Sequence, residues 1–271
     1  MKLSTLAPQS LRALVRKLRF ARRNAGFVPT IVKQDLGGVT FDFRIGDVMG
    51  QEWYAGPVAM SREMSFLRER MTGPGDVVLE CGAHHGFMTI LIAHWVGPTG
   101  RVTAFEASPA SAAILRANIE LNRLEDRVTV EAKAVGERAG TLKVSEESNA
   151  VPLTGRYEPG VRVAVVALDN YLDLGPTLIK LDIEGFEIEA LRGATRILER
   201  RPKLAIEVHV DMLRRYGRRA DEILEIIRPR DYDLWLQLGA DDAPRAYAGE
   251  SLNAQHMDQV HLYALPRGGS C

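Results

Sequence analysis

The feature that most constrains the fold is an alternation, beginning near residue 77, between short apolar runs rich in β-branched residues and segments with helical periodicity. Such runs are typical of parallel strands buried on both faces, and the helical segments supply the crossover connections. The pattern predicts a doubly wound, mostly parallel α/β sheet. Its seven expected strands span residues 77–81, 102–106, 128–132, 177–182, 203–209, 232–237 and 260–265.

Helical segments fit between these strands at residues 87–96, 109–122, 187–199 and 220–228. Ser108 should cap the second of them, and Pro109 stands in its first turn, where proline is favoured. Residues 135–168 break the alternation with several glycines and prolines, so we expect an extra strand pair and a loop beside the sheet. The length and pattern together predict one catalytic domain.

The first 72 residues predict an elaboration before the sheet domain, which would span residues 73–271. We expect a basic amphipathic helix, a hairpin over residues 31–45 that turns at Gly37 and Gly38, and a cap helix over residues 58–71. The basic helix precedes the first acidic residue and carries an apolar stripe of Leu11, Leu14, Val15 and Leu18. It could contact a membrane surface, a partner protein or the catalytic core, and burial against the core is the commonest outcome.

Composition limits the classes of partner and compartment. Lysine plus arginine equals aspartate plus glutamate at 35 each, so the chain has no net charge that would attract nucleic acid. Cys81 and Cys271 are too few for a disulfide framework and have no zinc-site spacing. The sequence has neither an apolar run of membrane-spanning length nor a signal-peptide core, so we expect a cytoplasmic protein.

A first motif joins the strand at residues 77–81 to the following helix. Glu80 is followed by Gly82 and Gly86, without the middle glycine that a dinucleotide site would have. A carboxylate here would repel a pyrophosphate but suits the ammonium group of a methionine moiety. The charge pattern therefore favours S-adenosylmethionine. The alternative is a bare strand–turn–helix corner in which Glu80 is a solvated cap.

A second carboxylate lies one βα unit later. Glu106 ends the strand at residues 102–106, about 20 residues beyond Gly86, which is the spacing of an acidic residue that accepts ribose hydroxyls. A helix-capping role ahead of Pro109 is the alternative. Because Glu80 and Gly86 point to the same ligand, Glu106 is our candidate ribose ligand.

Four titratable residues stand at the ends of the fourth and fifth expected strands. Asp182 and Glu184 come from the fourth, while Glu207 and His209 share one face of the fifth by the two-residue period of a strand. Open α/β sheets bind their ligands at the carboxyl ends of the strands. We therefore expect these side chains to converge at a reaction edge.

The motifs together resemble the FkbM family of S-adenosylmethionine-dependent O-methyltransferases over roughly residues 60–210. The most specific matches are FEASP (residues 105–109), IKLDIEGFE (179–187) and LRGA (191–194). The resemblance implies a Rossmann-like methyltransferase sheet and methyl transfer to a hydroxyl of a small molecule or sugar. The candidate cofactor-binding residues are Glu80, Gly82, Ala83, His84, Gly86, Glu106, Ala107 and Asp182. The chain departs from the family in its first block, where the family usually has Asp in place of Glu80 and Asn in place of His84.

Methyl transfer to a neutral alcohol requires alignment and a group that takes the proton. His209 is a candidate base because its ordinary pKa lies near neutrality, and Asp182 and Glu184 complete the candidate catalytic set. Two alternatives stay open at this stage. In the first, His209 is hydrogen-bonded at the strand end and has only a structural role. In the second, Asp182, Glu207 and His209 bind a divalent metal ion of undetermined identity. His84 and His85 fit packing or hydrogen bonding better than metal ligation.

Two rival functions differ from this hypothesis. A nucleic-acid methyltransferase would use the basic helix to hold phosphates, but the Asp-Ile-Glu-Gly edge lacks the Asn/Asp-Pro-Pro-aromatic pattern of base-amine methylation. The aromatic content of 7% also provides no aromatic–basic stripe for base stacking. A catalytically silent S-adenosylmethionine-binding module is the second rival, and cofactor turnover would distinguish it from an enzyme.

Overall fold

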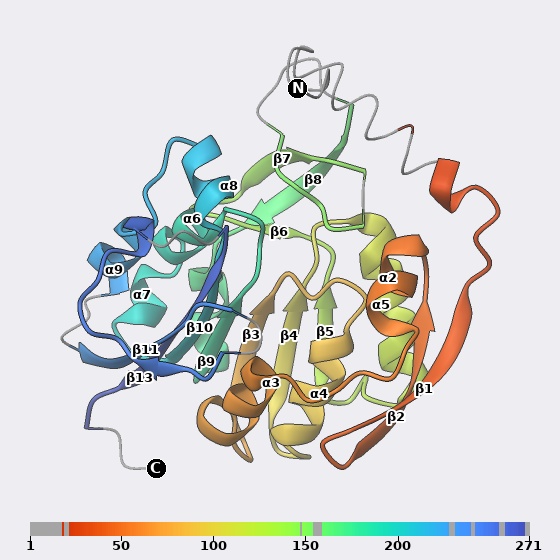
Figure 1. Ribbon diagram of the computed structural model, residues 1–271, viewed down its shortest axis with the longest axis horizontal. Coiled ribbons are helices and arrows are strands. Elements are labelled where there is room, and N and C mark those ends of the chain that lie inside the picture. Colours follow the sequence, from red (N-terminus) through yellow and green to blue (C-terminus); the bar gives the residue numbers. More distant parts are fainter. Residues whose placement is uncertain are drawn as a thin grey trace.

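The computed structural model describes residue 18 and residues 22–146, 148–153, 159–227, 231–239, 242–254 and 258–268. Its centre is an eight-stranded sheet in the order β12-β11-β13-β10-β9-β3-β4-β5 (Figure 1). All seven expected strands are confirmed, and a two-residue edge strand, β12, was not predicted. Their bounds are β3 (Val77–Cys81), β4 (Arg101–Phe105), β5 (Val128–Glu131), β9 (Leu178–Leu181), β10 (Lys203–Val208), β11 (Tyr232–Gln237), β12 (Arg245–Ala246) and β13 (Val260–Pro266).

The sheet is parallel from β5 to β10 and antiparallel beyond it. β13 lies antiparallel between β10 and β11, and β12 pairs antiparallel with β11. The central strands are apolar because both faces are covered. Val78 packs on the face that carries α4 and α5, whereas its neighbour Leu79 packs on the face that carries α6 and α9. The two cores therefore follow the two-residue period of a strand.

Three of the four expected helices lie close to their predicted positions. α4 (Phe87–Trp95), α5 (Pro109–Leu121) and α9 (Glu222–Ile227) match within a few residues, and the Ser108 hydroxyl caps α5 by accepting the backbone N–H of Ser111. The single helix expected at 187–199 is wrong, because it divides into α6 (Glu187–Arg192) and α7 (Thr195–Leu198). A β-carbon at Gly193 would lie 2.2 Å from the carbonyl oxygen of Gly136, so the chain bends where another segment touches it.

Two short helices were not predicted: α2 (Val48–Tyr54), capped by Asp47, and α8 (Val210–Arg215). The expected cap helix begins later, at Arg62, where Ser61 caps α3 (Arg62–Phe66), and it ends in a π-helical turn, η2 (Leu67–Met71). Two 3₁₀ turns are also present, η3 (Leu168–Leu174) and η5 (Leu252–Ala254).

The hairpin is confirmed as β1 (Thr30–Leu36) and β2 (Val39–Ile45), which turn at Gly37 and Gly38 with positive φ angles. Phe41 and Phe43 of β2 pack edge-on against Phe87 of α4, so the hairpin shares the core of the sheet. The extra strand pair is also confirmed, with one further strand, as β6 (Ala134–Val135), β8 (Val161–Val166) and β7 (Gly140–Val144). This small sheet lies beyond the carboxyl ends of β3, β4 and β5 (Figure 1).

Almost all of the predicted basic helix lies outside the described residues. Within the part of the chain that is described, no helix is long and apolar enough to cross a membrane.

Candidate active site

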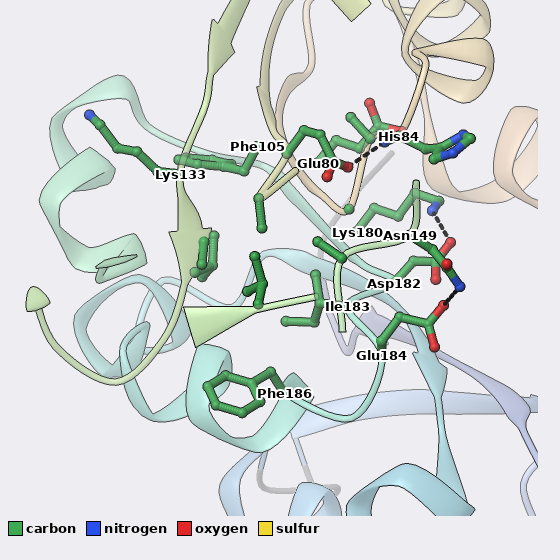
Figure 2. A pocket seen from close by; sticks show the side chains of 18 of the residues that line it. Glu80, His84, Phe105, Lys133, Asn149, Lys180, Asp182, Ile183, Glu184 and Phe186 are labelled. Atoms are coloured by element: carbon green, nitrogen blue, oxygen red, sulfur yellow. Dashed lines mark hydrogen bonds and ion pairs between the residues drawn. The ribbon is translucent and has the colours of Figure 1, made fainter. Parts of the chain in front are cut away.

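A pocket opens at the carboxyl ends of β3, β4 and β9, between α2 and the small sheet (Figure 2). Its wall combines apolar side chains, such as Phe105 and Ile183, with a row of charged ones. Besides the aromatic Trp53 and Tyr54, the charged and polar lining residues are Glu80, His84, Glu106, Lys133, Asn149, Lys180, Asp182 and Glu184. The first two motifs and half of the predicted reaction edge thus face one space, as expected for an open α/β sheet.

The turn after β3 is held tightly against the neighbouring strand. Gly82 has φ +88°, and a β-carbon there would lie 1.8 Å from the carbonyl oxygen of Asp182. The backbone N–H groups of Gly82 and Ala83 donate to the carbonyl oxygen of Phe105 at 2.9 and 3.0 Å. Gly82 and Ala83 therefore form the pocket wall while their amides are already paired. Gly86 is not a lining residue, and its α-carbon faces Leu115.

Glu80 is a buried member of the pocket wall. Its side chain is inaccessible to solvent, one carboxylate oxygen accepts the hydroxyl of Thr89 at 2.6 Å, and Oε1 has no hydrogen-bond partner among the described residues. Burial raises the pKa of Glu80, and the charge of Lys180, its cross-strand neighbour, opposes that shift. The interpretation of Glu80 as a solvated cap is therefore wrong.

Glu106 is fixed by the backbone on both sides. One carboxylate oxygen accepts the N–H of Ser108 and the other accepts the N–H of His84, each at 2.7 Å. Burial raises the pKa of Glu106 to about 7, although these backbone hydrogen bonds oppose the shift. Each oxygen retains a second lone pair, so the carboxylate can support the turn and still accept hydroxyl groups from a ligand.

His84 and His85 stack at the turn, with ring centroids 4.0 Å apart and ring planes 13° apart. The His84 ring hydrogen-bonds Ser148 and the Tyr54 hydroxyl, and burial lowers its pKa to about 3. Asp47 lies near enough to form a three-ligand set with them. Because nearly parallel rings cannot aim their in-plane lone pairs at one ion, the arrangement fits packing and hydrogen bonding rather than ligation.

The four predicted reaction-edge residues lie together. His209 Nε2 is 3.9 Å from a carboxylate oxygen of Asp182, 3.9 Å from one of Glu184 and 3.8 Å from one of Glu207. Asp182 and Glu184 line the pocket, whereas Glu207 and His209 are not among its lining residues. The carboxylates are therefore placed to touch a ligand, and His209 stands behind them.

Sequence reasoning missed the partner that holds His209. Glu187, fully buried in α6, accepts from His209 Nδ1 at 2.8 Å and from the backbone N–H of Gly185 at 3.0 Å. Burial lowers the pKa of His209, but the hydrogen bond to Glu187 and the charges of Asp182 and Glu207 outweigh it and raise the pKa to about 10. Without a cation at Nε2, the imidazole is therefore doubly protonated and positively charged at neutral pH. The sequence hints at this partner only by an acidic residue, Glu187, at the start of the helix that follows IKLDIEGF.

Lys180 is a second residue whose role sequence reasoning missed. It is 4% exposed, lines the pocket, and its Nζ lies 3.5 Å from a carboxylate oxygen of Asp182. Burial raises the pKa of Asp182, yet the charges of Lys180 and His209 lower it overall. The lysine therefore keeps Asp182 ionised while it also faces Glu80.

The comparisons with known proteins give the family. A family model described as the methyltransferase FkbM domain matches residues 80–234. A catechol O-methyltransferase of Mycobacterium tuberculosis is 31% identical over 118 residues, which is 39% of this chain and 52% of that protein. The 31-O-demethyl-FK506 methyltransferase FkbM of Streptomyces tacrolimicus is 39% identical over 82 residues, 30% of each chain.

A crystal structure of methyltransferase FkbM from Methylobacillus flagellatus KT is also similar, with a TM-score of 0.48 and 24% identity, and the match covers 72% of this chain and 44% of that one. The chain spans about half of the catechol relative and about a third of the FK506 relative. The family model, by contrast, covers more than half of this chain, from the acidic residue of β3 to the middle of β11. The chain belongs to the FkbM family of S-adenosylmethionine-dependent methyltransferases.

Proposed function

We propose that this chain transfers the methyl group of S-adenosylmethionine to a hydroxyl of a small molecule or sugar. The observation that carries the proposal is that Asp182 and Glu184 line the same pocket as Glu80 and Glu106. A carboxylate that can take a proton would therefore lie beside the space where the cofactor is held. Both curated relatives support oxygen as the acceptor atom, since their names describe methylation of a catechol and of a 31-O-demethyl compound.

The pocket offers complementary groups for the cofactor. Oε1 of Glu80 is buried without a partner among the described residues, and an ammonium group would satisfy its hydrogen-bonding capacity and its charge. Glu106 would accept the ribose hydroxyls through the lone pairs that His84 and Ser108 leave free. These two carboxylates would fix the two ends of the methionine–ribose portion.

S-adenosylmethionine, when bound, supplies a methyl group on a sulfonium, and transfer to oxygen leaves the C–S electron pair on sulfur and releases the hydroxyl proton. We assign that proton to Glu184. Burial raises the pKa of Glu184, although the His209 charge opposes the shift, and a raised pKa makes a carboxylate a better base. Asp182, ionised beside Lys180, would orient the hydroxyl. His209 would act through the carboxylates rather than on the acceptor.

The test is mass spectrometry of polyhydroxylated acceptors, including sugars and phenols, after incubation with the protein and S-adenosylmethionine. We expect products that carry one added methyl group, and Glu184→Gln should lower kcat by roughly 10² to 10⁴ while cofactor affinity stays nearly constant. Glu120→Gln, an identical change on the exposed face of α5, is the matched control. Cofactor binding without turnover on any acceptor would favour the silent module, and methylation confined to RNA or DNA would favour the nucleic-acid rival.

A further inference from the structure

We propose that Asp182, Glu207 and His209 bind a divalent transition-metal ion, and that Glu187 holds the imidazole in position for it. The three side chains come from the ends of β9 and β10, and each offers one ligand atom within 4.8 Å of the others. The set combines carboxylate oxygens with an imidazole nitrogen. These ligands suit a transition-metal ion such as Mn²⁺ better than Mg²⁺, which prefers oxygen ligands alone.

His209 has the orientation of a metal ligand. Its side chain is 9% exposed, and its Nδ1 is hydrogen-bonded to Glu187 at 2.8 Å. A histidine that binds a metal through one ring nitrogen usually donates its other N–H to a carboxylate, which fixes the tautomer and the ring plane. The pair therefore has the arrangement of a metal ligand and its supporting carboxylate.

The other ring nitrogen, His209 Nε2, is surrounded by carboxylates. Its nearest acceptors are oxygens of Asp182, Glu184 and Glu207, at 3.8 to 3.9 Å, and none of the hydrogen bonds within the described residues uses this nitrogen. Three carboxylates thus surround a buried nitrogen at distances too long for hydrogen bonds. A cation held by Asp182, Glu207 and His209 would satisfy these three ligand groups.

The distances between the candidate ligand atoms are close to those of a metal site. Metal–oxygen and metal–nitrogen bonds of about 2.1 Å place neighbouring ligand atoms about 3.0 Å apart at right angles and about 3.4 Å apart in a tetrahedron. The separations of His209 Nε2 from the Asp182 and Glu207 oxygens, 3.9 and 3.8 Å, exceed these values by less than about 1 Å, which small side-chain rotations can close. The side chains of Asp182 and Glu207 are 33% and 16% exposed, so they have room to rotate.

The site would share Asp182 with the wall of the cofactor pocket. An ion there would offer a coordination position to an acceptor oxygen, and this consequence alone rests on the proposed function. Binding of the ion itself requires no acceptor, so the two proposals can fail separately.

The test is a titration of chelator-treated protein with Mn²⁺, followed by calorimetry and by pulsed electron paramagnetic resonance. We expect one Mn²⁺ per chain, with a nitrogen coupling from a coordinated imidazole in the unmodified protein. Glu207→Gln and His209→Ala should weaken binding by about 10²-fold or more, and Glu187→Gln by about 10- to 100-fold. Glu63→Gln is the matched control, because Glu63 acts on this cluster only through its charge and offers it no ligand atom.

Absence of Mn²⁺ binding would overturn the proposal, and so would binding without a nitrogen coupling. Because the coupling is measured in the unmodified chain, a variant that fails to fold does not weaken the test. Binding that Glu63→Gln weakens as much as Glu207→Gln would indicate attraction by the general negative charge and would also overturn the site. Calorimetry of S-adenosylmethionine on the same samples shows separately whether the cofactor pocket is intact.

Discussion

Glu106→Gln tests how the cofactor's ribose is recognised. The substitution preserves size but removes the charge, and both carboxylate oxygens already accept a backbone N–H at 2.7 Å. The new amide NH₂ must therefore face either His84 N–H or Ser108 N–H. A hydrogen bond to a charged acceptor contributes about 1.5–3 kcal/mol, so loss of even one ribose contact should weaken S-adenosylmethionine binding by roughly 10- to 100-fold.

The pH dependence provides a second measure of the same group. Burial raises the pKa of Glu106 to about 7, and ribose hydroxyls donate best to the ionised form. At about pH 6 only about one tenth of the free protein would carry the ionised carboxylate, so affinity should fall about tenfold, or about 1.4 kcal/mol, relative to pH 8. The proton is held more tightly in the folded chain than in the unfolded one. The free energy of unfolding should accordingly fall as pH rises from about 4.5 towards 7.

Isothermal titration calorimetry at several pH values measures both effects, with circular dichroism to confirm folding. Glu120→Gln, on the exposed face of α5, should bind the cofactor like the parent at every pH. A role for Glu106 in ribose binding is refuted if folded Glu106→Gln binds S-adenosylmethionine as tightly as the parent at pH 8. It is equally refuted if parent and variant show the same loss of affinity towards pH 6.

Two further predictions concern stability, measured by urea denaturation. Gly82→Ala should lower the free energy of unfolding by about 3 kcal/mol or more, because φ is +88° and the new β-carbon would collide with backbone atoms. Gly38→Ala, at φ +81° but with open space around the new β-carbon, should lower it by only about 1–2 kcal/mol. Equal losses in the two variants would show that backbone strain alone, and not the collision, causes the effect. Lys180→Met should lower the free energy of unfolding by about 3–5 kcal/mol, because it leaves buried carboxylates unpaired. Adding Glu80→Gln to this variant should restore part of the lost stability, and simple additivity of the two single-variant losses would contradict the pairing of Lys180 with Glu80.

The sheet could be predicted from the sequence because strands buried on both faces leave continuous apolar runs. β9 is an example, since all four of its residues are buried. The division of the helix at 187–199 could not be predicted, because it depends on contact between Gly193 and Gly136, 57 positions earlier in the chain. The helix α2 could not be predicted either. Its seven residues include Gly50, which packs against the His85 ring and would discourage a helix in isolation.

The reaction edge could be predicted because the carboxyl ends of β9 and β10 adjoin, so Asp182 and His209 had to lie near one another. The separate roles of the residues at this edge could not be predicted. Glu187 appeared in the sequence as an acidic residue in the first turn of a helix, a common and usually solvated position. Only the packing of α6 shows that it is buried and bonded to His209. The sequence pattern therefore located the titratable groups but not the order in which they contact a ligand.

Lys180 shows what strand register adds to such a pattern. In the sequence it is a single lysine within an apolar strand, 100 positions from Glu80. In the sheet the two residues are direct cross-strand partners, and Lys180 also lies 3.5 Å from Asp182. One buried cation thus offsets a carboxylate on the cofactor side and another on the reaction side. An ammonium group bound at Glu80 would leave the full charge of Lys180 for Asp182, so occupation of the cofactor site and ionisation of the reaction edge are electrostatically linked.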